Sequence, residues 1–193
     1  IEETLIAWLV ATNGRSDCSL TLKCSSFNPT KTGMKIKQMV ERSHDRAKEM
    51  LGESFVSFSP VLLCDKILQD QFIPEFYMNS QYFITASKGE AFNLPLAEAM
   101  YYGLTTLAPA EGGHTLYCND KNSILMAGQW VKAGGVEGNG RYDNAGGWYD
   151  VNIGTIVDSI RYCLDNDTSK EAASGQAAVK ALLPAIRNAN LYA

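Results

Sequence analysis

The sequence predicts an α/β fold in which a parallel sheet carries helices on both faces. The first observation is that short apolar runs, typical of buried strands, alternate along the chain with longer amphipathic stretches, typical of helices. The second is that polar turns follow the apolar runs, as residues 87–93 follow the run 82–85. This alternation is the pattern of parallel βαβ units, and 193 residues suffice for one such domain.

In the first half of the chain, each element is predicted from apolar spacing. We expect helices at 3–12, 31–51, 63–68 and 72–79, and strands at 19–24, 54–58 and 82–85. The apolar positions of the opening helix are Ile1, Leu5, Trp8 and Leu9. The charged helix 31–51 is amphipathic, and its expected buried stripe consists of Ile36, Met39, Val40, Ala47, Met50 and Leu51.

In the second half, a helix over 94–102 should begin after Asn93, a good N-cap residue, and end at Gly103. A strand at 104–108 and helices at 150–166 and 168–189 follow, the last one broken near Pro184. Glycines and three large aromatic residues crowd the segment at about 128–148, which we interpret as a loop insertion, either a mobile surface segment or an acceptor-side or interface loop.

Composition excludes several classes of function. A net charge of −4 argues against a nucleic-acid partner. Five scattered cysteines without a Cys-x-x-Cys pair indicate neither a disulfide framework nor a zinc site, and they favour a reducing, cytoplasmic location. Two histidines are too few for a His-rich metal site. No apolar run reaches the roughly 20 residues of a membrane span, so we expect none.

Glu90 and Glu98 lie on either side of the expected turn from a strand into a helix. The carboxyl ends of parallel strands form the usual ligand edge of an open α/β sheet. There, backbone N–H groups and the positive end of the helix dipole can bind a phosphate without a basic side chain. The two carboxylates could then contact a sugar and a ribose.

The stretch Ser87-Lys88-Gly89-Glu90-Ala91-Phe92-Asn93-Leu94-Pro95-Leu96-Ala97-Glu98-Ala99-Met100 resembles the Glu-x7-Glu region of retaining GT-B glycosyltransferases of family GT4. The family's usual form is E-G-F-G-L-P-x-x-E-A-M. The following strand at 104–108 and Glu111-Gly112-Gly113-His114 resemble the next strand and its Gly-Gly turn. Two residues depart from the pattern, because Ala91 and Asn93 replace the family's glycines, and Ala91 would hinder a positive φ or a close approach to phosphate.

The resemblance implies that residues 1–193 form the Rossmann-like, C-terminal donor-binding domain of a GT-B enzyme. The N-terminal acceptor domain, and the Arg and Lys that usually hold the donor pyrophosphate, are then expected outside this chain, and the chain alone should be inactive. The implied partner is a nucleotide-sugar such as a UDP- or GDP-sugar, together with an unknown acceptor. The family needs no cofactor and no metal.

The resemblance also implies roles for individual residues. Glu90 would be the catalytic residue at the donor sugar, and Glu98 would accept the ribose hydroxyls. Candidate donor contacts are the turn and helix start at Lys88, Ala91, Phe92, Asn93 and Leu94, the Gly112–Gly113 turn, and Pro60 and Val61 in a loop that would follow strand 54–58 and border the base. His114 is a candidate substrate contact, and His44 should be solvated.

Two other functions stay open at this point. Ala91 and the missing pyrophosphate cations favour a non-catalytic module that binds a nucleotide-sugar or a glycan. A GT-B nucleotide-sugar epimerase would share the same fold and donor.

Overall fold

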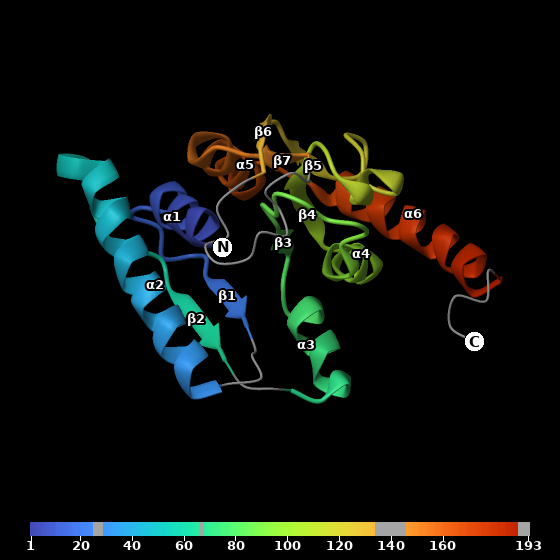
Figure 1. The fold of residues 1–193 in the computed structure, drawn as a ribbon, viewed down its shortest axis with the longest axis horizontal. Coiled ribbons are helices and arrows are strands. Elements are labelled where there is room, and N and C mark those ends of the chain that lie inside the picture. The colour runs from blue at the N-terminus through green and yellow to red at the C-terminus, as the bar shows by residue number, and fades with distance from the viewer. Residues whose placement is uncertain (25–28, 66–67, 134–145, 189–193) are drawn as a thin grey trace.

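The computed structural model describes residues 1–24, 29–65, 68–133 and 146–188, and it has the predicted α/β fold with parallel strands and flanking helices (Figure 1). Strand β1 (Leu20–Lys23) pairs in parallel with β2 (Val61–Cys64). Strands β3 (Tyr82–Ile84), β4 (Thr105–Pro109) and β5 (Ile124–Met126) form a second parallel sheet in that order. The prediction of one continuous sheet was therefore wrong in this detail, since the described parallel strands form two hydrogen-bonded groups.

Helix α1 (Glu2–Ala11) is buried around almost its whole circumference rather than along one stripe. It packs against both α2 (Pro29–Leu51) and α5 (Ile153–Asp165), which cover it from different directions (Figure 1). Ile1, expected in its apolar face, is 72% exposed because it precedes the helix. In α2, Ala47 is fully buried, whereas Met50 is 47% exposed, so the predicted stripe does not extend to Met50.

The segment after α2 differs most from the prediction. A 3₁₀ turn, η1 (Gly52–Ser54), and an extended stretch without strand pairing occupy the place of the expected strand 54–58. The strand is β2 instead, so Leu63 and Cys64 belong to a strand and not to the expected helix 63–68, of which residues 66–67 lie outside the described part. The 3₁₀ turn η2 (Asp70–Phe72) and helix α3 (Ile73–Met78) then match the helix expected at 72–79.

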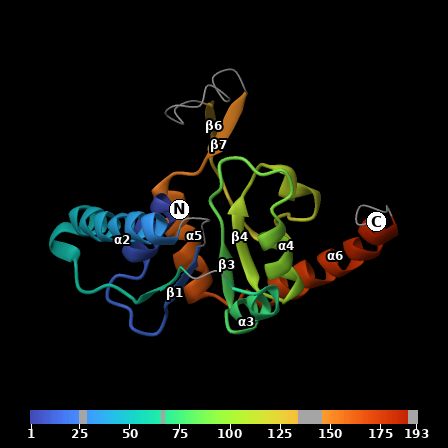
Figure 2. The same cartoon turned by 60° about the horizontal axis from the view of Figure 1, so that its bottom comes forward.

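Strand β4 is buried along its whole length because helices cover both of its faces. Its successive side chains belong to different clusters, as alternation in a strand requires. Leu107 joins a core built on α1 and α5, while Ala108 joins a core of Leu96, Met100 and the α6 residue Val179. Figure 2 shows α4 (Leu94–Tyr101) and α6 (Ser169–Asn188) on one side of β3 and β4, with α5 on the other.

The Gly-rich segment contains paired strands. Strand β6 (Gln129–Lys132) and strand β7 (Gly147–Asp150) form an antiparallel pair that projects from the body of the molecule (Figure 2). The ends of the predicted loop insertion are thus strands, and its middle, residues 134–145, lies outside the described part. Helix α6 is continuous across Pro184, contrary to the expected break, and position 189 of the predicted helix again lies outside the described residues.

Candidate donor-binding site

The turn from β3 into α4 has the local geometry that the sequence predicted. Asn93 is the N-cap of α4, and its side-chain oxygen accepts a hydrogen bond from the Leu96 N–H at 3.3 Å. Asn93 also adopts a left-handed conformation, with φ of 61°, which asparagine tolerates better than most residues. Ala91 does not have a positive φ, so its methyl group causes no backbone strain of that kind. Helix α4 ends at Tyr101, Tyr102 is its C-cap, and Gly103 follows with φ of 82°.

A second turn, formed by Gly112 and Gly113, packs directly against the first. The Gly113 N–H donates a hydrogen bond to the Glu90 carbonyl oxygen at 2.9 Å. A β-carbon on Gly113 would lie 1.7 Å from the Ala91 carbonyl oxygen, so no other residue fits there without a shift of the backbone. The two turns, both expected at the ligand edge of the sheet, are therefore in contact.

Two side chains from the short helix η3 (Gly113–Leu116) and the residue after it brace these turns. The Tyr117 hydroxyl donates toward the carbonyl oxygens of Phe92 and Asn93, at 2.7 and 2.9 Å, and its ring packs on Phe92. Burial raises the pKa of Tyr117, and the neighbouring acidic groups of Cys118 and Glu90 add to the shift. His114 is buried, with Nε2–H donating to the Pro109 carbonyl oxygen at 2.7 Å, so it lies beneath the turn rather than on the surface as a substrate contact.

The two glutamates have different surroundings. Glu90 is exposed at the turn. Glu98, one helical turn into α4, is half-buried, and its Oε2 accepts a hydrogen bond from the Tyr77 hydroxyl of α3 at 2.8 Å. Burial, followed by this bond to Glu98, raises the pKa of Tyr77 well above its usual value. Glu90 is thus positioned through its backbone, and Glu98 through its side chain.

Lys88, a candidate phosphate contact, is already paired with two carboxylates. Its Nζ lies 2.6 Å from Asp150 Oδ1 on β7 and 3.3 Å from Glu3 Oε1 on α1. The bond to Asp150 raises the pKa of Lys88, with Glu3 contributing in the same direction. The Lys88 carbonyl oxygen also accepts a hydrogen bond from the Tyr149 N–H at 2.9 Å. These contacts fasten the turn to the base of the β6–β7 pair.

Pro60 and Val61 were predicted to follow a strand, but Val61 is instead the first residue of β2. They lie at the amino end of a parallel strand, whereas ligands of α/β sheets bind outside the carboxyl ends. The base-contact prediction arose from placing a strand at 54–58. Since the carboxyl end of β2 is Cys64, the premise for assigning the base to Pro60 and Val61 is wrong.

The described residues contain no group of three or more His, Cys, Asp or Glu side chains arranged to hold a metal. The sequence does contain one Asp-x-Asp, at Asp165 and Asp167. Asp165 forms an ion pair with Arg15 at 2.7 Å, and Asp167 accepts a hydrogen bond from the Ser169 N–H at the start of α6. Asp165 thus ties α5 to the loop that follows α1, and Asp167 contacts the start of α6, so both carboxylates have structural partners. Among the described helices, none is long and apolar enough to cross a membrane.

At the level of sequence, the chain matches no protein-family model and no curated protein. Its fold is similar to that of several solved GT-B glycosyltransferases. Sucrose-phosphate synthase from Thermosynechococcus elongatus matches with a TM-score of 0.62 at 18% identity, over 99% of this chain and 41% of that protein.

HepE of Anabaena, in complex with UDP and glucose, matches with a TM-score of 0.57 at 17% identity, over 96% of this chain and 43% of HepE. A trehalose-6-phosphate protein of E. coli bound with UDP-2-fluoro glucose matches with a TM-score of 0.59 at 9% identity, over 95% of this chain and 37% of that protein. The chain therefore has the fold of one part of such enzymes and spans less than half of their length.

Sequence reasoning missed the residues that support the turn from a distance. Tyr77, Tyr117 and Asp150 each contact a predicted site residue through a side chain, at separations of 21 to 62 positions along the chain. Tyr77 and Tyr117 lie in segments whose aromatic residues resemble ordinary core positions. The sequence carried no local signal that would have distinguished them.

Proposed function

We propose that this chain binds the nucleotide-sugar donor of a retaining, GT4-like glycosyltransferase, and that the whole enzyme transfers a sugar to an acceptor without a metal. The observation that carries the proposal is the position of Glu90 and Glu98 around the start of α4, outside the carboxyl end of β3. The similar structures with bound UDP or a UDP-sugar have this fold and support a donor of that class.

The start of α4 favours an anion at one particular place. Pro95 has no N–H, and the Leu96 N–H already donates to Asn93. Among the described residues, the groups left open to a diphosphate are therefore the N–H groups of Phe92, Asn93 and Leu94. The Asn93 side-chain nitrogen is buried and has no hydrogen-bond partner among the described residues. A buried donor without a partner is costly, and a phosphate oxygen would satisfy it.

In this proposal Glu98 accepts the two ribose hydroxyls, and Glu90 faces the sugar and the charge that develops at the transferring carbon. Front-face displacement assisted by the leaving diphosphate accounts for retention without a covalent glycosyl-enzyme. The acceptor, and cations for the diphosphate, would come from the rest of the enzyme. Holding both substrates together is required for turnover, so the step to test on this chain is donor binding.

One observation favours a second candidate, a non-catalytic module that binds a nucleotide-sugar. Both carboxylate partners of Lys88 lie within 3.3 Å of its Nζ, so this cation is already neutralised and does not replace the usual pyrophosphate cations. Donor binding without turnover by the full-length protein would support this candidate. Release of an epimerised sugar without any acceptor would indicate an epimerase instead.

The test is calorimetric titration of the chain with UDP and with GDP. We expect binding of at least one of them. Glu98→Ala should weaken it about 10- to 150-fold, which corresponds to the loss of a charged acceptor of about 1.5 to 3 kcal/mol. Asn93→Asp keeps an oxygen that can cap the helix and replaces the unpaired amide by a carboxylate. This variant should also bind more weakly than the wild type, because the carboxylate repels the diphosphate. Full affinity in both variants would contradict the proposal.

A further inference from the structure

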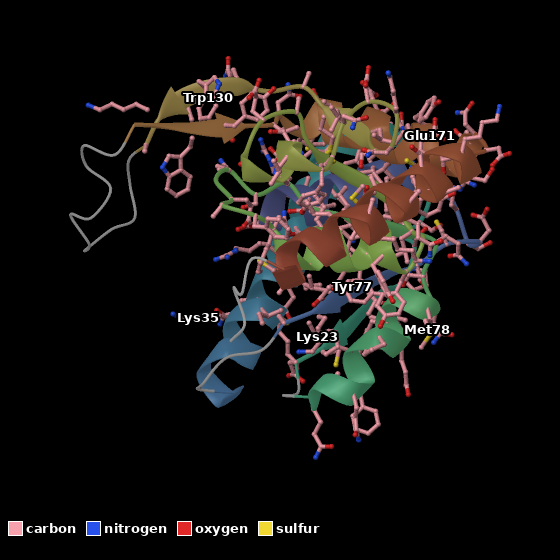
Figure 3. The ribbon with its side chains drawn as sticks, turned by 90° about the vertical axis from the view of Figure 1, so that its right-hand side faces the viewer. Lys23, Lys35, Tyr77, Met78, Trp130 and Glu171 are labelled. Atoms are coloured by element: carbon pink, nitrogen blue, oxygen red, sulfur yellow. The ribbon has the colours of Figure 1, made fainter. Side chains whose placement is uncertain are left out.

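Tyr77 is the side chain through which α3 reaches the proposed ribose acceptor. Its hydroxyl donates to Glu98 Oε2 at 2.8 Å, across a separation of 21 residues (Tyr77 is labelled in Figure 3). A hydrogen bond from a hydroxyl to a carboxylate is charge-assisted and stronger than a neutral one. The contact therefore fixes the orientation of the Glu98 carboxylate before any ligand arrives.

The ring of Tyr77 has a packing partner on the same helix as Glu98. It stacks on Tyr102 with 5.5 Å between ring centroids and an interplanar angle of 8°. Because Tyr102 follows Glu98 by four residues, both lie on the same face of α4. Tyr77 thus lies along α4, with its ring beside Tyr102 and its hydroxyl one turn closer to the helix N-terminus. A tyrosine hydroxyl is protonated at neutral pH, and burial, which raises the pKa of Tyr77 above its usual value, keeps it a donor into the alkaline range.

We propose that Tyr77 is a positioning residue for nucleotide binding, which holds the Glu98 carboxylate so that its remaining lone pairs accept the ribose hydroxyls. This inference rests on the proposed function. An ionised carboxylate has about four lone-pair sites, and Tyr77 occupies one of them. Both oxygens therefore stay open to a ribose diol, and Glu98 loses less side-chain freedom on binding because its rotamer is already selected.

The experiment is a double-mutant cycle on the 193-residue chain, with UDP affinity measured by calorimetry. Tyr77→Phe removes one oxygen atom and keeps the stacked ring. It should weaken UDP about five- to tenfold, as expected for a charge-assisted bond that acts through Glu98. In the Glu98→Ala background, Tyr77→Phe should have no further effect. Tyr101→Phe, which removes a neighbouring hydroxyl from α4, is the control and should stay within twofold of wild type.

The outcomes separate this inference from the function on which it rests. Equal losses for Tyr77→Phe in the presence and absence of Glu98 would show a general structural role and overturn the proposal. Wild-type affinity in Tyr77→Phe, with a large loss in Glu98→Ala, would overturn the role of Tyr77 while the proposed function stands. No loss in Glu98→Ala would contradict both. Thermal unfolding of each variant verifies that the fold is intact.

Discussion

The Gly113 N–H donates to the Glu90 carbonyl oxygen at 2.9 Å, and this bond joins the two turns of the candidate site. It leaves the Glu90 side chain exposed while its backbone is held. The same contact brings the Gly113 α-carbon against the Ala91 carbonyl, where a methyl group has no room. A residue proposed to act on the donor is thus positioned by a glycine more than twenty residues away.

We expect Gly113→Ala to destabilise the chain and to disturb the Glu90 turn, because the added β-carbon would lie 1.7 Å from the Ala91 carbonyl oxygen. The cost should be about 1 to 3 kcal/mol, the usual range for overpacking. Gly89→Ala is a control in the same turn, since its β-carbon meets nothing within 4 Å. Urea unfolding of both variants measures the difference, and equal stabilities would mean that the two turns are not packed as described.

Lys88→Met should reduce stability and leave UDP affinity within about twofold of wild type. The lysine is anchored by Asp150 and Glu3, and partly exposed ion pairs contribute about 0.5 to 1 kcal/mol. The exposed Lys132→Met controls for the loss of one positive charge. A large drop in UDP affinity specific to Lys88→Met would show instead that Lys88 leaves its carboxylate partners to bind phosphate.

The buried thiol of Cys163 should resist alkylation in the native protein over a wide pH range. Burial raises its pKa to about 12, from 9.0 for an exposed thiol. Because the folded-state pKa is raised, the stabilisation is complete below about pH 9 and is lost as pH rises from there toward 12. Iodoacetamide labelling with mass spectrometry at pH 8 and 10 should show modification of the partly exposed Cys18, while Cys163 reacts only in denaturant.

The part of the fold predicted best is the block from β3 to β4. There the signals are local: an apolar run, an N-cap asparagine, a short helix and a terminating glycine agree with one another, and Asn93 and Gly103 have the predicted roles. Both turns were expected at the same edge of the sheet, but a contact between them was not predicted. What no local signal revealed was how the contact is made, because it depends on the packing of Gly113 against Ala91.

The strand predicted at 54–58 failed because its apolar residues pack on a helix rather than pair with a strand. Phe55 and Phe58 contact each other, and Phe58 meets His44 of α2 edge to face. The true strand, β2, is selected by its pairing with β1, about forty residues earlier in the chain. Strands β6 and β7 were not predicted either. Each is selected by its pairing with the other, and the glycines around them indicate a loop.

The last prediction concerns Glu90, whose proposed partner is the sugar and not the nucleotide. Glu90→Ala should leave UDP affinity of the chain within about twofold of wild type, because the backbone bond to Gly113 survives the loss of the side chain. In the full-length enzyme the same change should lower kcat steeply, since an interaction made with the transition state is removed. Glu98→Ala should differ from it by weakening UDP binding to the chain.

UDP titration together with steady-state kinetics separates the roles of Glu90 and Glu98. Similar, negligible effects of both changes would mean that the Glu-x7-Glu resemblance is accidental, and the assignment as a donor-binding domain would then fail.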